Sequence, residues 1–258
     1  MSKTLNIALI QTPLHWEDPV SNRKMFDEKL ATIPSNVDVI VLPEMFTSGF
    51  TMKPGHLEAS EGGITLKWMQ DLAKAKDAAV VGSIVFQVAD QFFNRLFFVY
   101  PDGATKSYDK KHTFTLAGED EVYEAGKEKL ILDFKGFKIC PMICYDLRFP
   151  VWSRNSEDYD VLMYVANWPK KRIAAWDTLL KARAIENMAY CIGVNRVGLD
   201  GADFEYTGHS AVYDVLGEQL CYSEKEEVLY ATLDEAHIED TRKQLRFLED
   251  RDRFSLIE

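Results

Sequence analysis

Hydrophobic residues follow two patterns along this chain: short apolar runs alternate with longer stretches in which apolar residues recur every three or four positions. The short runs are rich in Val, Ile, Phe and Tyr, which is typical of β-strands. These runs predict strands over residues 5–11, 37–42, 79–88, 95–100, 105–110, 137–143, 161–165, 191–197, 210–213, 218–222 and 228–232. The longer stretches have the period of amphipathic helices. They predict helices over residues 21–33, 64–76, 151–156, 171–189 and 234–247.

The order of these elements predicts an α/β protein, and we expect a single domain over residues 1–258. Residues 37–42 form a continuous apolar run, which is typical of a strand buried on both faces. The two halves of the chain repeat the order of strands and helices, which favours a pair of mixed sheets with helices outside. In such folds, functional sites lie beyond the ends of the strands.

Three finer expectations concern how individual elements begin, face and pair. Ser21 or Asn22 is expected to cap the first helix, because both side chains can accept a hydrogen bond from the first turn. Ile185 is expected on the buried face of the helix over residues 171–189. The last three strands, between residues 210 and 232, are expected to form a meander.

Composition and charge narrow the function classes. The chain has 258 residues, 47% of them hydrophobic, so it can bury a sizeable core. Its formal net charge of −11 argues against nucleic acid or an anionic membrane as partner, although local Lys or Arg residues could still bind a small anion. The N-terminal apolar run is too short for a signal peptide, and none is long enough to span a membrane, so we expect a cytoplasmic protein.

The four cysteines are expected to be free thiols, because no secretory signal accompanies them. Cys140 and Cys144 are four residues apart, but no second Cys/His pair lies nearby to complete a zinc site, so no metal is expected. A redox pair of these two cysteines is disfavoured. On an extended strand they lie about 13 Å apart, too far for a disulfide unless Pro141 bends the chain.

Four chemically capable residues fall at predicted strand ends: Glu44, Lys110, Glu119 and Cys144. A thiol at such an end is a strong nucleophile when a nearby base removes its proton. Each residue also has an ordinary interpretation. Glu44 could be a helix cap and Cys144 a small core side chain, while Lys110 and Glu119 could be solvated charges.

The segments LPEMF (residues 42–46), YDKKHTF (108–114) and ICYDLRFP (143–150) resemble the three signature motifs of the nitrilase superfamily of carbon–nitrogen hydrolases. The resemblance implies an αββα sandwich of two mixed sheets flanked by helices. It also implies a catalytic triad of Glu44, Lys110 and Cys144, with a second glutamate at Glu119. Because two positions beside the lysine depart from the family pattern, Lys111 remains a fallback, although alternation sends it to the opposite face from Lys110.

The resemblance further implies a mechanism that needs no metal and no organic cofactor. Cys144 would attack an amide carbon and form a thioester, with Glu44 as general base. Lys110 and the backbone N–H of Tyr145 would stabilise the oxyanion, while Glu119 would orient Lys110.

Residues 164–198 are similar to bacterial omega-amidases, which implies hydrolysis of the terminal amide of 2-oxoglutaramate or 2-oxosuccinamate to the 2-oxo acid and ammonia. The substrate carboxylate would then need a cation. Arg148 is the first candidate, and Lys170, Lys171 and Arg172 follow; Trp168 and Phe50 could wall the pocket. Arg148 could instead form a structural ion pair, residues 170–172 could be a solvated helix start, and the two aromatic residues could be core or interface filler.

Two other functions remain open at this point: another activity of the same superfamily, such as a carbamoylase or nitrilase, and a catalytically silent binding protein. The expected partner is a small amide substrate, not nucleic acid or a membrane. By the same resemblance we expect a homodimer or higher homo-oligomer, with Val151, Trp152 and the helix over residues 234–248 at the interface.

Overall fold

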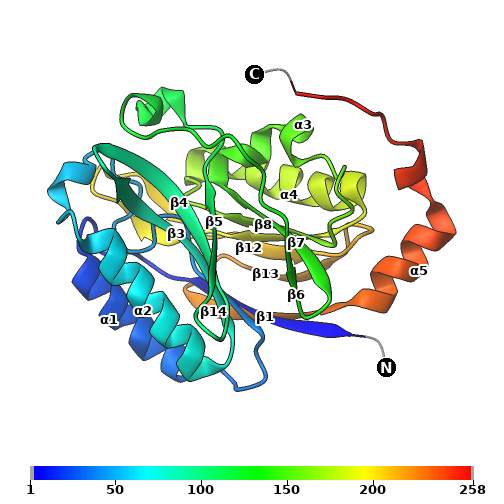
Figure 1. The fold of residues 1–258 in the computed structure, drawn as a ribbon, viewed down its shortest axis with the longest axis horizontal. Coiled ribbons are helices and arrows are strands. Elements are labelled where there is room, and N and C mark those ends of the chain that lie inside the picture. Colours follow the sequence, from blue (N-terminus) through cyan, green and yellow to red (C-terminus); the bar gives the residue numbers. More distant parts are fainter. Residues whose placement is uncertain (1–2, 257–258) are drawn as a thin grey trace.

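The computed structural model describes residues 3–256 and contains two six-stranded sheets packed face to face, with helices on their outer faces (Figure 1). The first sheet has the strand order β14-β1-β2-β3-β4-β5, and the second has the order β13-β12-β9-β8-β7-β6. Each sheet has three parallel strands at its centre and antiparallel strands outside them. The predicted α/β class and the pair of mixed sheets are confirmed.

The strands of the first sheet are β1 (Thr4–Gln11), β2 (Val39–Val41), β3 (Ala79–Val88), β4 (Gln91–Val99), β5 (Thr105–Asp109) and β14 (Glu227–Asp234). Those of the second are β6 (Leu132–Phe134), β7 (Phe137–Ile143), β8 (Val161–Val165), β9 (Tyr190–Val194), β12 (Ser210–Tyr213) and β13 (Gln219–Ser223). A two-stranded ribbon of β10 (Val197–Leu199) and β11 (Glu205–Thr207) stands apart from both sheets.

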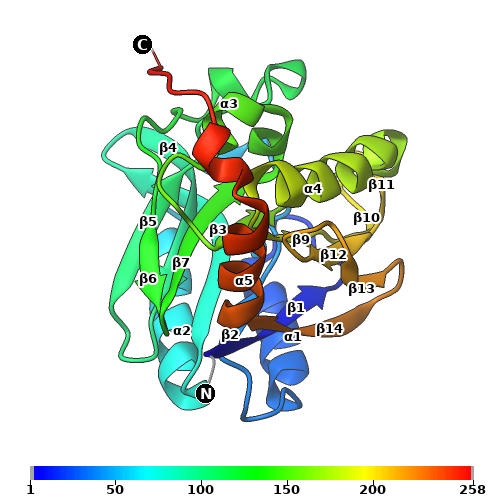
Figure 2. The same cartoon turned by 90° about the vertical axis from the view of Figure 1, so that its right-hand side faces the viewer.

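The helices are α1 (Pro19–Ala31), α2 (Glu61–Lys76), α3 (Pro150–Ser153), α4 (Ile173–Asn187) and α5 (Glu235–Leu245). Helices α1 and α2 cover the first sheet, and α4 covers the second (Figure 1). Helix α5 follows β14 and runs along the end of the sandwich (Figure 2). There Arg242 donates hydrogen bonds to the backbone carbonyls of Tyr159 and Met188, which ties α5 to the second sheet.

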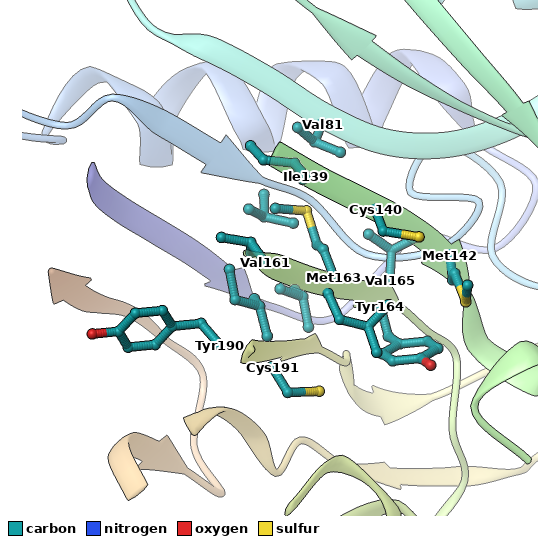
Figure 3. Packing of buried hydrophobic residues seen from close by; sticks show 14 of the residues in the cluster. Val81, Ile139, Cys140, Met142, Val161, Met163, Tyr164, Val165, Tyr190 and Cys191 are labelled. Carbon is teal, nitrogen blue, oxygen red and sulfur yellow. The ribbon is translucent and has the colours of Figure 1, made fainter. Parts of the chain in front are cut away.

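Side chains along the strands of the first sheet alternate between two hydrophobic cores: one lies between the two sheets, and the other lies under helices α1 and α2. In β1, Leu5, Ile7 and Leu9 face the other sheet, whereas Ala8 and Ile10 face α1 and α2. This is the period-two pattern of a strand that is buried on both faces. Figure 3 shows the core between the sheets, where side chains of β7, β8 and β9 gather and those of the first sheet, such as Val81, approach them.

Six short 3₁₀ turns complete the described chain and several of them shape the site. They are η1 (Pro54–His56), η2 (Thr115–Ala117), η3 (Glu119–Glu121), η4 (Cys144–Arg148), η5 (Lys170–Arg172) and η6 (Phe247–Asp250). Within residues 3–256, every helix is too short or too polar to cross a lipid bilayer.

The first two finer expectations were wrong, and the third was right only for its first two strands. The first helix begins at Pro19, and Asp18 rather than Ser21 or Asn22 caps it by accepting from the Ser21 N–H. Ile185 is 47% exposed, because the buried face of α4 follows Trp176, Leu180 and Ala184 instead. Of the expected meander, β12 and β13 do pair antiparallel, but β14 does not continue it: β14 pairs with β1 of the other sheet, a partner that local pattern does not specify.

Candidate active site

A cavity of about 540 Å³ lies beyond the carboxyl ends of strands from both sheets. Cys144 directly follows β7 and Asn167 follows β8, while Lys110 directly follows β5. All three of these residues line the cavity, and Glu44, which follows β2, lies buried beside them. Segments that are far apart in the sequence therefore deliver their polar side chains to one place, as expected at the ends of parallel strands.

Glu44 is fully buried, yet both of its carboxylate oxygens are hydrogen-bonded. Oε1 accepts from Lys110 Nζ at 2.8 Å and from Asn94 Nδ2 at 2.8 Å. Oε2 accepts from the backbone N–H of Asn167 at 2.8 Å. The Asn167 side chain also donates to the Glu44 carbonyl at 2.6 Å, so the carboxylate has one fixed orientation.

Lys110 lies between the two glutamates and is only 1% exposed. Its Nζ donates to Glu119 Oε1 and Oε2 at 3.0 and 2.9 Å, in addition to Glu44. Glu119 is held by further bonds from the Phe114 N–H at 2.6 Å and from Asn94 Nδ2 at 3.1 Å. A buried amine that is bonded to two carboxylates has little freedom to move.

Lys111, the fallback for Lys110, points elsewhere. Its Nζ lies 5.3 Å from the Trp152 ring centroid and does not line the cavity. The backbone of Lys110 is fixed on both sides, because its N–H donates to the Asn94 carbonyl and its own carbonyl accepts from Gly126 N–H. Only glycine fits at residue 126, where a Cβ would lie 2.0 Å from the Asp109 carbonyl oxygen.

Cys144 sits on a tight turn with a positive φ of 43°, a conformation that non-glycine residues rarely adopt. Asp146 holds this turn by accepting from the Ile143 N–H at 3.0 Å and from the Tyr108 hydroxyl at 2.8 Å. It also accepts from the His112 N–H at 3.0 Å. Tyr108 and His112 frame Lys110 in the sequence, so one carboxylate joins the lysine motif to the cysteine motif.

Electrostatics assign different protonation states to the thiol and the amine. Burial raises the pKa of the Cys144 thiol well above its ordinary value, and the Glu44 charge raises it further, with Lys110 offsetting part of the effect. Burial alone would lower the pKa of Lys110, but the charges of Glu119 and Glu44 raise it above its ordinary value. At neutral pH the resting site therefore holds a neutral thiol beside an ammonium group.

Two asparagines of the site were missed by sequence reasoning. Asn94 is buried in β4 and bridges Glu44 and Glu119. Asn167 orients Glu44, and its backbone carbonyl accepts from Cys144 Sγ at 3.9 Å. A signal for Asn94 existed: it is a lone amide in the aromatic strand QFFNRLFFV, where a buried polar side chain needs partners.

Some of the other predicted site residues line the cavity and some lie outside it. Arg148, Trp168 and Phe50 all line the cavity, as does Tyr145. Arg172 lines it as well, whereas Lys170 and Lys171 do not; Lys170 instead pairs with Glu205 at 2.8 Å. The alternative interpretation of Arg148 as a structural ion pair is wrong, because within residues 3–256 no carboxylate lies within salt-bridge distance of its guanidinium.

Of the residues expected at a subunit interface, Val151 is 50% exposed, but Trp152 is buried within its own chain. The Trp152 indole donates to the Tyr108 hydroxyl at 3.1 Å and stands edge-on to the His112 ring. Because the Tyr108 hydroxyl in turn donates to Asp146, Trp152 helps to hold the turn that carries Cys144.

The family profile, the related sequences and the related structure all indicate carbon–nitrogen hydrolases. The carbon–nitrogen hydrolase family profile matches residues 6–243. The chain is 43% identical over 256 residues to the omega-amidase YafV of Yersinia enterocolitica, covering 98% of this chain and 99% of that one. It is 30% identical over 250 residues to the 2-oxoglutaramate amidase of Bacillus subtilis, covering 95% and 96% of the two chains. The crystal structure of XC1258 from Xanthomonas campestris, a CN-hydrolase superfamily protein with an arsenic adduct in its active site, superposes with a TM-score of 0.95 at 40% identity, covering 98% and 99%.

Proposed function

The chain belongs to the carbon–nitrogen hydrolase family and is an amide hydrolase of the omega-amidase type; from this premise we propose that it converts 2-oxoglutaramate or 2-oxosuccinamate to the 2-oxo acid and ammonia through a thioester on Cys144. One observation carries the proposal. Lys110 and Cys144 line one cavity, and Glu44 lies buried behind them, bonded to Lys110. The wall of the same cavity holds the Arg148 guanidinium, which has no carboxylate partner within residues 3–256, so a nucleophile and a carboxylate-binding group border one space.

In the acylation step, Glu44 accepts the proton from Cys144 Sγ as the sulfur attacks the terminal amide carbon. The raised pKa of the thiol supports this order, because the proton leaves only when the attack begins. The amide oxygen becomes an oxyanion, which Lys110 Nζ and the Tyr145 N–H stabilise. Glu44 then gives its proton to the nitrogen, the carbon–nitrogen bond breaks, and ammonia leaves a thioester behind.

In the deacylation step, a water molecule takes the place of ammonia. Glu44 removes one proton from this water, and the resulting hydroxide adds to the thioester carbon. The second tetrahedral intermediate collapses as the carbon–sulfur bond breaks and Glu44 returns the proton to sulfur. Lys110 remains an ammonium throughout, which its raised pKa favours, and Glu119 and Asn94 keep it and Glu44 in position.

The proposal is tested by measuring ammonia release from a panel of small compounds by the purified protein. We expect 2-oxoglutaramate and 2-oxosuccinamate to exceed glutamine, asparagine, an N-carbamoyl amino acid and an aliphatic nitrile by at least about tenfold in kcat/KM, the discrimination of one well-placed charge contact. A carbamoyl compound or nitrile as the best substrate would contradict the proposal and assign another activity of the family.

The half-exposed apolar side chain of Val151 on α3 supports the further proposal that the chain forms a homodimer or larger homo-oligomer. Light scattering at micromolar concentration measures the mass directly. A mass equal to that of one chain would contradict it.

A further inference from the structure

Two arginines on the cavity wall have the same unusual environment. Arg148 Cζ lies 4.9 Å from the Trp168 ring centroid, and Arg172 Cζ lies 4.9 Å from that of Phe114. Within the described chain, neither guanidinium has a carboxylate or carbonyl partner within hydrogen-bond distance. Stacking on an aromatic ring orients a guanidinium while leaving its N–H donors free for a ligand.

Both arginines are tied to the buried residues of the site. Arg148 ends the short turn that begins with Cys144. Trp168, on which Arg148 stacks, donates its indole N–H to the Arg172 carbonyl at 2.8 Å. Phe114, on which Arg172 stacks, is held by its own N–H to Glu119 and contacts the Tyr145 ring at 4.9 Å between centroids. The two guanidinium groups are therefore positioned by the same framework that positions Lys110 and Cys144.

The acidic residues of the same cavity differ, because their carboxylates are already occupied. Glu17 accepts hydrogen bonds from Thr51 and from His56. Asp200 accepts from the Tyr206 hydroxyl at 2.8 Å and from the backbone N–H groups of Ala202 and Phe204. The cavity thus offers free positive groups and satisfied negative groups, a combination that favours an anion over a zwitterion.

We propose that Arg172 acts with Arg148 to bind the 2-oxo carboxylate end of the substrate, and that this pair selects 2-oxo acid amides over both uncharged amides and amino acid amides. The inference rests on the proposed function, because it concerns the substrate of the same pocket. Two guanidinium forks can engage a carboxylate and its adjacent carbonyl oxygen together. The ammonium group of an amino acid amide would instead meet two like charges, while the Glu17 and Asp200 carboxylates already accept hydrogen bonds from the protein.

The affinity for 2-oxoglutarate, the expected product, measures the carboxylate-binding role of Arg172 separately from catalysis. We would measure it by calorimetry on Cys144→Ala protein, with and without Arg172→Met. The arginine loss should weaken binding about 10- to 100-fold, the range for a hydrogen-bonded charge, and Arg172→Lys should restore part of it. Lys181→Met, which removes a cation from the exposed surface of α4, should leave the affinity unchanged.

Kinetics on the protein with Cys144 intact completes the test. Arg172→Met should raise KM for 2-oxoglutaramate about 10- to 100-fold while changing KM for butanamide less than about twofold. Equal losses on the two substrates, or unchanged 2-oxoglutarate affinity, would overturn the inference. If the unmutated protein releases no ammonia from 2-oxoglutaramate, the proposed function fails, and calorimetry still decides whether Arg172 binds a 2-oxo carboxylate.

Discussion

The site contains two charged regions that are built in opposite ways. The buried cluster of Glu44, Asn94, Lys110 and Glu119 joins every charge to a partner of opposite sign or to an amide. The arginine pair of Arg148 and Arg172 is half-buried, stacks on aromatic rings and leaves its charge unpaired within the described chain. Lys110 of the buried cluster and both arginines line one cavity.

This difference in pairing corresponds to a difference in expected role: the buried cluster serves the catalytic step, and the arginine pair serves substrate selection. A buried charge without a partner costs several kcal/mol, so the cluster must be complete before any substrate arrives. A group that is meant to bind a charged ligand has the opposite requirement, because a resident partner would compete with the ligand. We therefore expect damage to the buried cluster to lower kcat and damage to the arginine pair to raise KM.

The largest effect should come from removing the nucleophile. Cys144→Ala should lower kcat by at least about 10⁴-fold, because no other group can form the thioester. The melting temperature should stay close to that of the unmutated protein, since the bond from the thiol to the Asn167 carbonyl, at 3.9 Å, is weak. Ammonia release separates the outcomes, and turnover at a comparable rate would contradict the assignment of Cys144.

Breaking the buried cluster should give the next largest effect. Asn94→Ala removes a donor from both Glu44 and Glu119, and we expect kcat to fall about 10- to 100-fold and the free energy of unfolding to fall by about 1–3 kcal/mol. Steady-state kinetics and denaturant unfolding measure the two quantities. A change in KM alone would show that the cluster takes part in substrate binding instead.

A substitution in the arginine pair should affect KM rather than kcat, in contrast to substitutions in the buried cluster. Arg148→Met should raise KM for 2-oxoglutaramate about tenfold more than KM for a neutral amide, with kcat nearly unchanged. The exposed Lys67→Met, which removes a similar charge on α2, serves as the control. Equal losses on charged and neutral amides would assign Arg148 a structural role.

The smallest expected signal is the absence of a step in a pH profile. Because the pKa of Cys144 is raised, the folded state favours the neutral thiol, and thiolate does not accumulate at the ordinary thiol pKa of about 8.5. The rate of Cys144 alkylation by iodoacetamide, followed by mass spectrometry, should therefore show no sigmoidal rise between about pH 7.5 and 9. A clear step in that interval would mean that the thiol titrates normally.

Most strand positions and three of the four buried-cluster residues could be predicted from the sequence. Glu44, Lys110 and Glu119 each belong to a motif or follow a strong apolar run, so local pattern marks them. Asn94 was missed because its role depends on two carboxylates that are 50 and 25 residues away. The cap at Asp18 and the exposed Ile185 were misjudged because neighbouring residues offered equally good local choices.

The sequence by itself determined the alternation of strands and helices and the motifs that mark Glu44, Lys110 and Cys144, because periodicity and turn chemistry are local properties. Only the tertiary structure decided which sheet receives β14, that Lys110 rather than Lys111 meets the glutamates, and that Arg148 and Arg172 have no carboxylate partner within residues 3–256. Those outcomes depend on distances between segments that are remote in the chain. Such distances are set by the packing of two sheets, which no local pattern encodes.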